Sequence, residues 1–380
     1  MSFHEKFHIG AYYLQKNART EEHIRDLALC GIDVLFGINC DRDTLDMLHR
    51  HGIGAVVNGV VPGWFGAHGE KAGEMHLTNP IGRYVEGAER FCDHPAILGI
   101  DIGDEPSALD FPHLGSVVDA IRPYFKDKLL YLNIYPSYGM LADSAPEQIS
   151  KELGRASYRD YLLAYLSEVD LPYLSFDHYF LSSDKERFLS DLATASELCR
   201  ERGKSLMTVL QVNSREADRF ASLGDLRFQA FSAFAYGAMT VTWACYCAGW
   251  WHNNVLDSAG VRTEQYDKLK QVNTELGFFA ERCKRAREGS PERIFAGLAS
   301  KEGGVVSSVN ALICPLEGGG FFYSPLSYES GAVELRLRSD SGRSPEIRVF
   351  DGELPVRKEA DGSFTVTFSA AVPAIITCRN

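Results

Sequence analysis

Apolar runs and amphipathic stretches alternate regularly along the first three quarters of the chain. Eight short runs rich in β-branched and aromatic residues predict strands, and a stretch with helical spacing follows each of them. Nearly continuous apolar runs are typical of strands buried on both faces of a parallel sheet. The expected strands are residues 7–13, 32–38, 53–57, 97–105, 129–135, 173–179, 205–212 and 239–246. The expected helices are residues 20–30, 41–50, 81–92, 111–125, 158–169, 185–202, 226–236 and 262–287.

This alternation predicts an α/β fold, a (β/α)₈ barrel over residues 1–288. A doubly wound open sheet would need a Gly-rich phosphate turn after the first strand, and Leu14-Gln-Lys-Asn stands there instead. From Ile294 onward the pattern changes to alternating apolar and polar residues, as in Val333-Glu-Leu-Arg-Leu-Arg, with Gly-containing turns between the runs. Residues 289–380 are therefore expected to form a small antiparallel β-sandwich domain.

Composition narrows the function classes. The chain has 380 residues, 45% of them hydrophobic and 24% charged, which is ordinary for a globular protein. A formal net charge of −12 without a Lys/Arg cluster argues against nucleic acid as a partner. The N-terminus lacks a basic-then-apolar leader, and no apolar run approaches the roughly 18 residues of a membrane span. We therefore expect a cytoplasmic protein that does not contact a membrane, while its oligomeric state stays open.

The sequence gives no sign of a metal or cofactor. The nine cysteines are odd in number and scattered, without repeated C-x-x-C pairs, which favours reduced thiols over disulfides or zinc. His178 and His252 lack partners at ligand spacing, so no metal site is expected. A Gly-x-Ser-x-Gly turn of the kind that carries a nucleophilic serine is also missing from the sequence.

The stretch Ile97-Leu-Gly-Ile-Asp-Ile-Gly-Asp-Glu-Pro-Ser107 is the centre of the predicted site. It begins as an apolar strand and ends in two adjacent carboxylates, Asp104 and Glu105, directly before Pro106. Pro106 cannot continue a central strand, so both acids lie at its carboxyl end, where (β/α)₈ barrels carry their active sites. The alternative is that one acid caps the next helix, but capping needs only one acid.

Other polar and aromatic residues fall at the carboxyl ends of later strands. Residues at alternate positions share a face, which pairs Asn133 with Tyr135 and Asp177 with Tyr179. The long segment 58–79 is expected to fold over the same end of the barrel. Rings stack on sugar faces, although Trp243 is equally explained as barrel core. The predicted substrate-binding residues are Asn58, Trp64, Asn133, Tyr135, Tyr179, Gln211, Trp243 and Trp250.

A carboxylate pair that ends the fourth strand as Asp104-Glu105-Pro106 resembles the large clan of (β/α)₈ glycoside hydrolases, which carry Asn/Asp-Glu-Pro at this place. The resemblance covers about residues 7–287, and a trailing β-sandwich is common in such enzymes. It implies a carbohydrate substrate, no cofactor, and Glu105 as the general acid/base. It also implies that Asp104 contacts the sugar 2-hydroxyl, where the clan usually has Asn.

The seventh strand departs from that clan. The clan's nucleophile is a Glu at the end of this strand, and Gln211 stands at the expected place. Three readings remain open. Asp177 is the second carboxylate, either as nucleophile or as base for water. Alternatively, a substrate acetamide is the nucleophile and Asp104 orients it, as in substrate-assisted hexosaminidases. In the third reading the barrel binds carbohydrate without catalysis.

Overall fold

The computed structural model describes residue 3 and residues 6–39, 41–66, 69–140, 151–182, 184–247, 249–283, 290–299, 305–317, 319–326, 332–337, 343–369 and 371–378. Contacts divide the chain into two compact units. The first contains residues 1–220 and 238–267, and the second contains residues 221–237 and 268–380. The domain boundary expected near residue 288 falls within residues 284–289, outside the described part of the chain.

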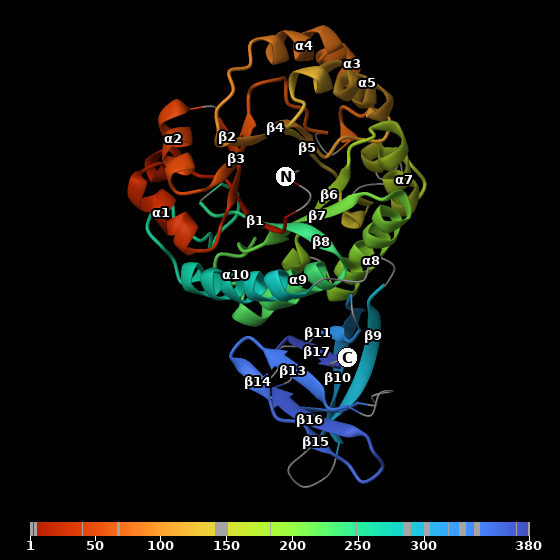
Figure 1. Ribbon diagram of the computed structural model, residues 1–380. Coiled ribbons are helices and arrows are strands. Elements are labelled where there is room, and N and C mark those ends of the chain that lie inside the picture. Colours follow the sequence, from red (N-terminus) through yellow and green to blue (C-terminus); the bar gives the residue numbers. More distant parts are fainter. Residues whose placement is uncertain are drawn as a thin grey trace. The chain divides into compact units, whose positions relative to one another are not determined.

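Eight parallel strands form one sheet in the order β5-β4-β3-β2-β1-β8-β7-β6. Ile134, which follows β5, forms a parallel bridge with Phe176, and its N–H donates to the Ser175 carbonyl at 2.9 Å. This contact closes the sheet into the ring of strands seen in Figure 1. The strands are β1 (His8–Tyr12), β2 (Val34–Asn39), β3 (Gly54–Asn58), β4 (Ile97–Asp104), β5 (Leu129–Asn133), β6 (Tyr173–His178), β7 (Ser205–Gln211) and β8 (Ala238–Ala244).

The helices begin and end at residues suited to those positions. Thr20, Ser157 and Asp184 each accept a hydrogen bond from the backbone N–H three residues on, which satisfies a free donor of the first turn. Gly203 ends a helix at φ 62°, a conformation that glycine adopts without strain. The helices are α1 (Glu21–Leu29), α2 (Arg42–Arg50), α3 (Met75–Thr78), α4 (Ile81–Glu89), α5 (Phe111–Ile121), α7 (Tyr158–Glu168), α8 (Lys185–Arg202), α9 (Leu223–Ala235) and α10 (Gln265–Arg282).

The barrel predicted from the sequence is confirmed, because every expected strand and helix is present within a few residues of its expected bounds. Continuous apolar runs mark the strands that are buried on both faces. Every residue of β5 and of β6 is buried, as parallel strands covered by helices require. Their buried polar members, Asn133, Ser175 and Asp177, are therefore enclosed by the barrel and matter for the site below.

The second unit contains the predicted β-sandwich, which is confirmed. A six-stranded sheet has the order β14-β13-β17-β11-β10-β9, and a three-stranded sheet has the order β12-β16-β15. Their shared core joins Tyr323 and Ile347 of the larger sheet to Val366 and Phe368 of the smaller one. The strands are β9 (Glu292–Ala299), β10 (Val305–Pro315), β11 (Phe321–Pro325), β12 (Ala332–Leu337), β13 (Pro345–Val349), β14 (Gly352–Leu354), β15 (Arg357–Lys358), β16 (Phe364–Ser369) and β17 (Ala374–Cys378).

Helices α9 and α10 belong largely to this second unit. Phe322 of β11 contacts Phe234 and Phe279, with ring centroids 5.2 and 5.4 Å apart, and Phe231 contacts Phe279 at 5.7 Å. Within the described part of the chain, no helix combines the length and the apolar character needed to span a bilayer.

Candidate functional site

The backbone that carries the two adjacent acids is fixed by the loop after β3. The Asp104 N–H donates to the Trp64 carbonyl at 2.6 Å, and the Gly66 N–H donates to the Asp104 carbonyl at 3.3 Å. Phe65 forms a parallel bridge with Asp104, so this loop runs beside the end of β4 as a short extra strand. The Glu105 N–H donates to the Asn133 carbonyl at 2.9 Å on the other side. Both neighbours of β4 therefore position the acids.

Glu105 has a backbone φ of 47°, which is uncommon for a residue with a side chain. Such conformations persist where the surroundings determine them, and they gather at functional sites. Here the surroundings include Gly66, because a Cβ atom at this position would lie 2.0 Å from the Glu105 carbonyl oxygen. A glycine is thus required for the loop to approach Glu105.

We expect Gly66→Ala to lower the free energy of unfolding by about 1–3 kcal/mol, the usual cost of forcing a methyl group into a packed site. Gly63→Ala is the matched control, because it lies in the same loop and a Cβ there meets nothing within 4 Å. Urea unfolding of the two variants measures the difference. If Gly66→Ala and Gly63→Ala have the same stability, the loop does not constrain Glu105.

Two carboxylates, one from the end of β4 and one from β6, share the amide of Asn133. The Asn133 side chain, at the end of β5, donates through Nδ2 to Asp177 Oδ1 at 2.8 Å and to Asp104 Oδ1 at 3.4 Å. Asp177 Oδ1 and Asp104 Oδ1 are therefore no more than 6.2 Å apart, because they lie 2.8 and 3.4 Å from the same nitrogen. Glu105 is half-buried, and the negative charges of Asp177 and Asp104 act on it.

Burial and mutual repulsion favour the protonated forms of these acids. Burial, followed by the charges of Asp177, Asp104 and Glu152, raises the pKa of Glu105 well above its ordinary value. Burial raises the pKa of Asp104 to about 6, although its side chain reaches solvent, and the Asn133 hydrogen bond opposes this shift. The pKa of Asp177 rises to about 7, by burial and then by the Asp104 charge. Carboxylates packed this closely do not all ionise together at neutral pH, so the cluster holds protons.

Tyr12 of β1 and Tyr179 after β6 lie near enough for the charges of the acids to act on their hydroxyl groups. Tyr179 packs edge-on against Trp251, with their ring centroids 4.9 Å apart. The ring centroids of Tyr12 and Trp250 are 6.5 Å apart, and Trp250 is 39% exposed. The exposed Arg215 guanidinium lies over the Trp251 ring at 4.9 Å. An exposed indole is suited to stacking on the apolar face of a sugar.

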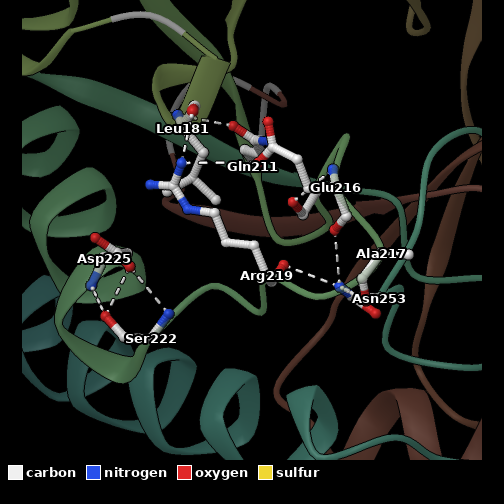
Figure 2. A network of polar contacts seen from close by, with 9 residues as sticks. Leu181, Gln211, Glu216, Ala217, Arg219, Ser222, Asp225 and Asn253 are labelled. Carbon is white, nitrogen blue, oxygen red and sulfur yellow. Dashed lines mark hydrogen bonds and ion pairs between the residues drawn. The ribbon is translucent and has the colours of Figure 1, made fainter.

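The loops after β7 and β8 that carry these groups are tied together, as Figure 2 shows. Asn253 donates through Nδ2 to the carbonyls of Glu216, Ala217 and Arg219 at 3.3, 3.1 and 2.9 Å. Ser214 and His252 add an antiparallel bridge, with N–H···O distances of 2.9 and 2.7 Å. The two loops therefore form one joined segment.

Three predicted binding residues have almost no exposed surface. Gln211 is fully buried, and its Oε1 accepts the Leu181 N–H at 3.0 Å (Figure 2), so it holds the turn after β6 in place. Trp243 is also fully buried and pairs in register with Ala11 and Leu210, which makes it barrel core. Tyr135 is 2% exposed, and the Tyr161 hydroxyl accepts its N–H at 3.3 Å.

The remaining predicted residues lie at the end of β3 or in the loop after it. Asn58 is half-buried at the end of β3, in register with Asn39 of β2. Trp64 is 5% exposed and takes part through its carbonyl, which accepts the Asp104 N–H. His178 faces away from the acids, because its Nδ1 lies 2.9 Å from Asp191 Oδ2 in a fully buried pair.

Sequence reasoning missed several groups at this site. Asp101 is half-buried on β4, and burial followed by the Asp104 charge raises its pKa to about 8. A charged residue inside an apolar strand was the available signal. Tyr12 and Glu152 carried no such signal, because tyrosine suits a strand and Glu152 is distant in sequence from every strand end. Their proximity to the acids is visible only in the folded chain.

A separate hollow has none of the three predicted catalytic acids in its lining. It measures about 490 Å³ and is lined by Ser137, Tyr158 and residues of α8, including Asp191 and Arg187. We place the candidate site at the carboxylates instead, because the ends of β4, β5 and β6 converge there. Within the described residues, no group of three or more His, Cys, Asp or Glu side chains is arranged to hold a metal ion.

Comparison with known proteins finds likeness of structure only. No protein family matches the chain, and no curated protein matches it in sequence. An α-amylase from Anoxybacillus is similar in structure at 9% identity with a TM-score of 0.59, covering 100% of this chain and 99% of that one. A proposed α-L-fucosidase from Bacteroides thetaiotaomicron is similar at 10% identity with a TM-score of 0.50, covering 72% and 97%.

A β-galactosidase from Bacillus circulans is also similar, at 16% identity with a TM-score of 0.46. The match covers 72% of this chain and 56% of the β-galactosidase, so the chain spans a little over half of that protein. At these identities the likeness to the α-amylase and the α-L-fucosidase establishes a shared fold, and fold alone does not define the reaction.

Proposed function

We propose that this protein is a glycoside hydrolase acting on an oligo- or polysaccharide, with Glu105 as the general acid/base. The observation that carries the proposal is that Asp104 and Asp177 share the Asn133 amide, and that Glu105 lies near enough for the charges of both to act on it. A carboxyl group kept protonated at neutral pH is what a general acid requires. The Glu105 proton goes to the leaving oxygen as the bond from that oxygen to the anomeric carbon breaks.

The second catalytic group is Asp177 or a substrate acetamide. As a base, Asp177 takes a proton from water while the water oxygen bonds to the anomeric carbon. In the substrate-assisted route the acetamide oxygen bonds to that carbon, and Asp104 orients the acetamide. The shared Asn133 amide supports both routes, because it holds both aspartates in fixed places.

A second candidate function is carbohydrate binding without catalysis. It is favoured by Gln211, whose side-chain oxygen serves the Leu181 backbone at the strand end where related barrels carry a carboxylate nucleophile. In this reading the acids hydrogen-bond sugar hydroxyls, and Trp250 stacks on the ring. A hydrolase and a binding protein would both have affinity for sugars, but only the hydrolase would turn them over.

Assays with aryl glycosides separate the two candidates. The panel covers α and β anomers of common hexoses, their N-acetylated forms and uronides, each measured from pH 4 to 9. We expect release of the aryl alcohol from at least one member, and a slower release by Glu105→Gln, most of all when the aryl alcohol is a poor leaving group. A saturable change in tryptophan fluorescence on addition of the same sugars, without turnover of any member, would instead establish a binding protein.

A further inference from the structure

A chain of buried hydroxyl groups leads to the amide that joins the two aspartates. The Tyr12 hydroxyl donates to the Tyr131 hydroxyl at 2.9 Å. The Tyr131 hydroxyl lies 3.3 Å from Ser175 Oγ, and Ser175 Oγ donates to Asn133 Oδ1 at 3.1 Å. Tyr131 and Ser175 are each 1% exposed. The chain thus crosses the barrel interior from β1 to β5 and β6.

The protons available decide which group donates in each of these hydrogen bonds. Each hydroxyl has a single proton, and an amide oxygen can only accept. Because Ser175 donates its proton to Asn133, Tyr131 must donate to Ser175 and Tyr12 to Tyr131. The Asn133 NH₂ group faces the carboxylates of Asp177 and Asp104, and its oxygen faces Ser175, which donates to it. The opposite amide orientation would place a carbonyl oxygen against two carboxylates.

We propose that Tyr12, Tyr131 and Ser175 are positioning residues, which lock the Asn133 amide so that its two N–H groups hold Asp104 and Asp177 at a fixed separation. The inference rests on the proposed function only for its effect on catalysis, because the orientation of the Asn133 amide does not depend on a substrate. Hydrogen bonds in such a chain polarise one another, so each contact strengthens the next. Tyr12 is the half-exposed end, and its oxygen can still accept a ligand hydroxyl.

Loss of the fixed amide orientation should change the pKa of both aspartates in one direction. The Asn133 hydrogen bond lowers the pKa of both Asp104 and Asp177 against the effect of burial. An amide free to turn withdraws this donor, so both pKa values rise and the acids ionise only at higher pH. Other titratable groups interact with this pair or with Glu105 from the surrounding elements. They are Tyr12, Asp101, Glu105, Tyr131, Tyr138, Glu152, Tyr158, Tyr161 and Tyr179, and Arg215 acts on Tyr138.

The test compares two single-hydroxyl deletions in neighbouring strands. Ser175→Ala removes the contact to Asn133. Thr208→Val is the matched control, because Thr208 is 1% exposed in β7 and its hydroxyl has no hydrogen-bond partner among the described residues. Tyr131→Phe breaks the chain one step earlier and keeps the ring, which covers the case in which Ser175→Ala does not fold.

The first readout needs no substrate. The full chain is labelled with ¹³C at the Asp carboxyl carbon and titrated by NMR, with Asp104 and Asp177 assigned from their Asn variants. We expect both titrations to move up by about 0.5–1 pH unit in Ser175→Ala and Tyr131→Phe, the effect of one lost hydrogen bond. Thr208→Val should leave them in place. Unmoved titrations in the first two variants, or an equal shift in the control, would overturn the proposal.

The second readout is the pH dependence of kcat/KM on an aryl glycoside. Its rising limb should move up by the same amount in Ser175→Ala and not in Thr208→Val. A shifted NMR titration without turnover of any glycoside would uphold the positioning role and refute the hydrolase proposal. Turnover with an unshifted titration would do the reverse.

Discussion

Glu105→Gln is expected to lower kcat/KM by about 10²–10⁴-fold on a glycoside with a poor leaving group, the usual contribution of a general acid. The amide keeps the shape of the carboxyl group but has no acidic proton to give. A dinitrophenyl glycoside, whose leaving group needs no proton, should lose much less. The ratio of the two losses is the measurement, because misfolding would reduce both substrates equally. An equally active variant would remove Glu105 from the mechanism.

The same substitution has an opposite expected effect on stability. The pKa of Glu105 is raised in the folded state, so the folded chain holds a proton that the unfolded chain has lost above about pH 4.5. Wild-type stability therefore falls as pH rises from the unfolded toward the folded pKa. Glu105→Gln avoids this loss, and its Tm should exceed that of the wild type at pH 8 and match it at pH 4. Loss of activity with a higher Tm is typical of a functional residue.

The second large effect separates the two aspartates. If Asp177 is the base, Asp177→Asn should reduce turnover by at least about 10³-fold, and the first product should have inverted configuration. We expect this outcome, because Gln211 occupies the place of a close nucleophile and inverting pairs leave about 6.5–9.5 Å for water. In that case activity should rise with pH through the raised pKa of Asp177, about 7, since the ionised form is the base.

Proton NMR of the first-formed sugar distinguishes the alternative. If Asp104 orients a substrate acetamide, Asp104→Asn should be the crippling variant, only N-acetylated sugars should react, and configuration should be retained. Each variant serves as the control for the other, because both replace one oxygen of an aspartate held by Asn133. Full activity in both variants would contradict both routes.

Sequence patterning predicted the barrel because apolar periodicity follows the burial of each strand and helix. It also placed Asp104, Glu105, Asn133 and Asp177 at strand ends, which the fold brings to one side of the barrel. It could not separate Gln211 from these residues, because a buried amide that serves a backbone N–H has the same sequence position as one that faces a ligand. That distinction depends on side-chain contacts.

The hydroxyl chain escaped prediction for a related reason. Tyr12, Tyr131 and Ser175 fit their strands as ordinary β residues, and their contacts join positions 119 and 44 residues apart. Asp101 offered a signal, an acid among isoleucines, which strand-end reasoning passed over because it lies three residues before the strand ends. Residues that act through others are found from geometry, whereas residues at exposed strand ends are found from pattern.

The joined segment after β7 and β8 affects how its two loops can change in evolution and in protein engineering. Asn253 uses one side chain to hold three carbonyls of the other loop, so an insertion in either loop shifts the register of both. If the protein binds sugars as proposed, variation that changes its sugar preference through Arg215, Trp250 or Trp251 is expected as paired changes in the two loops. A graft intended to move this preference to another barrel must carry both loops together, since either one alone would lack its anchor.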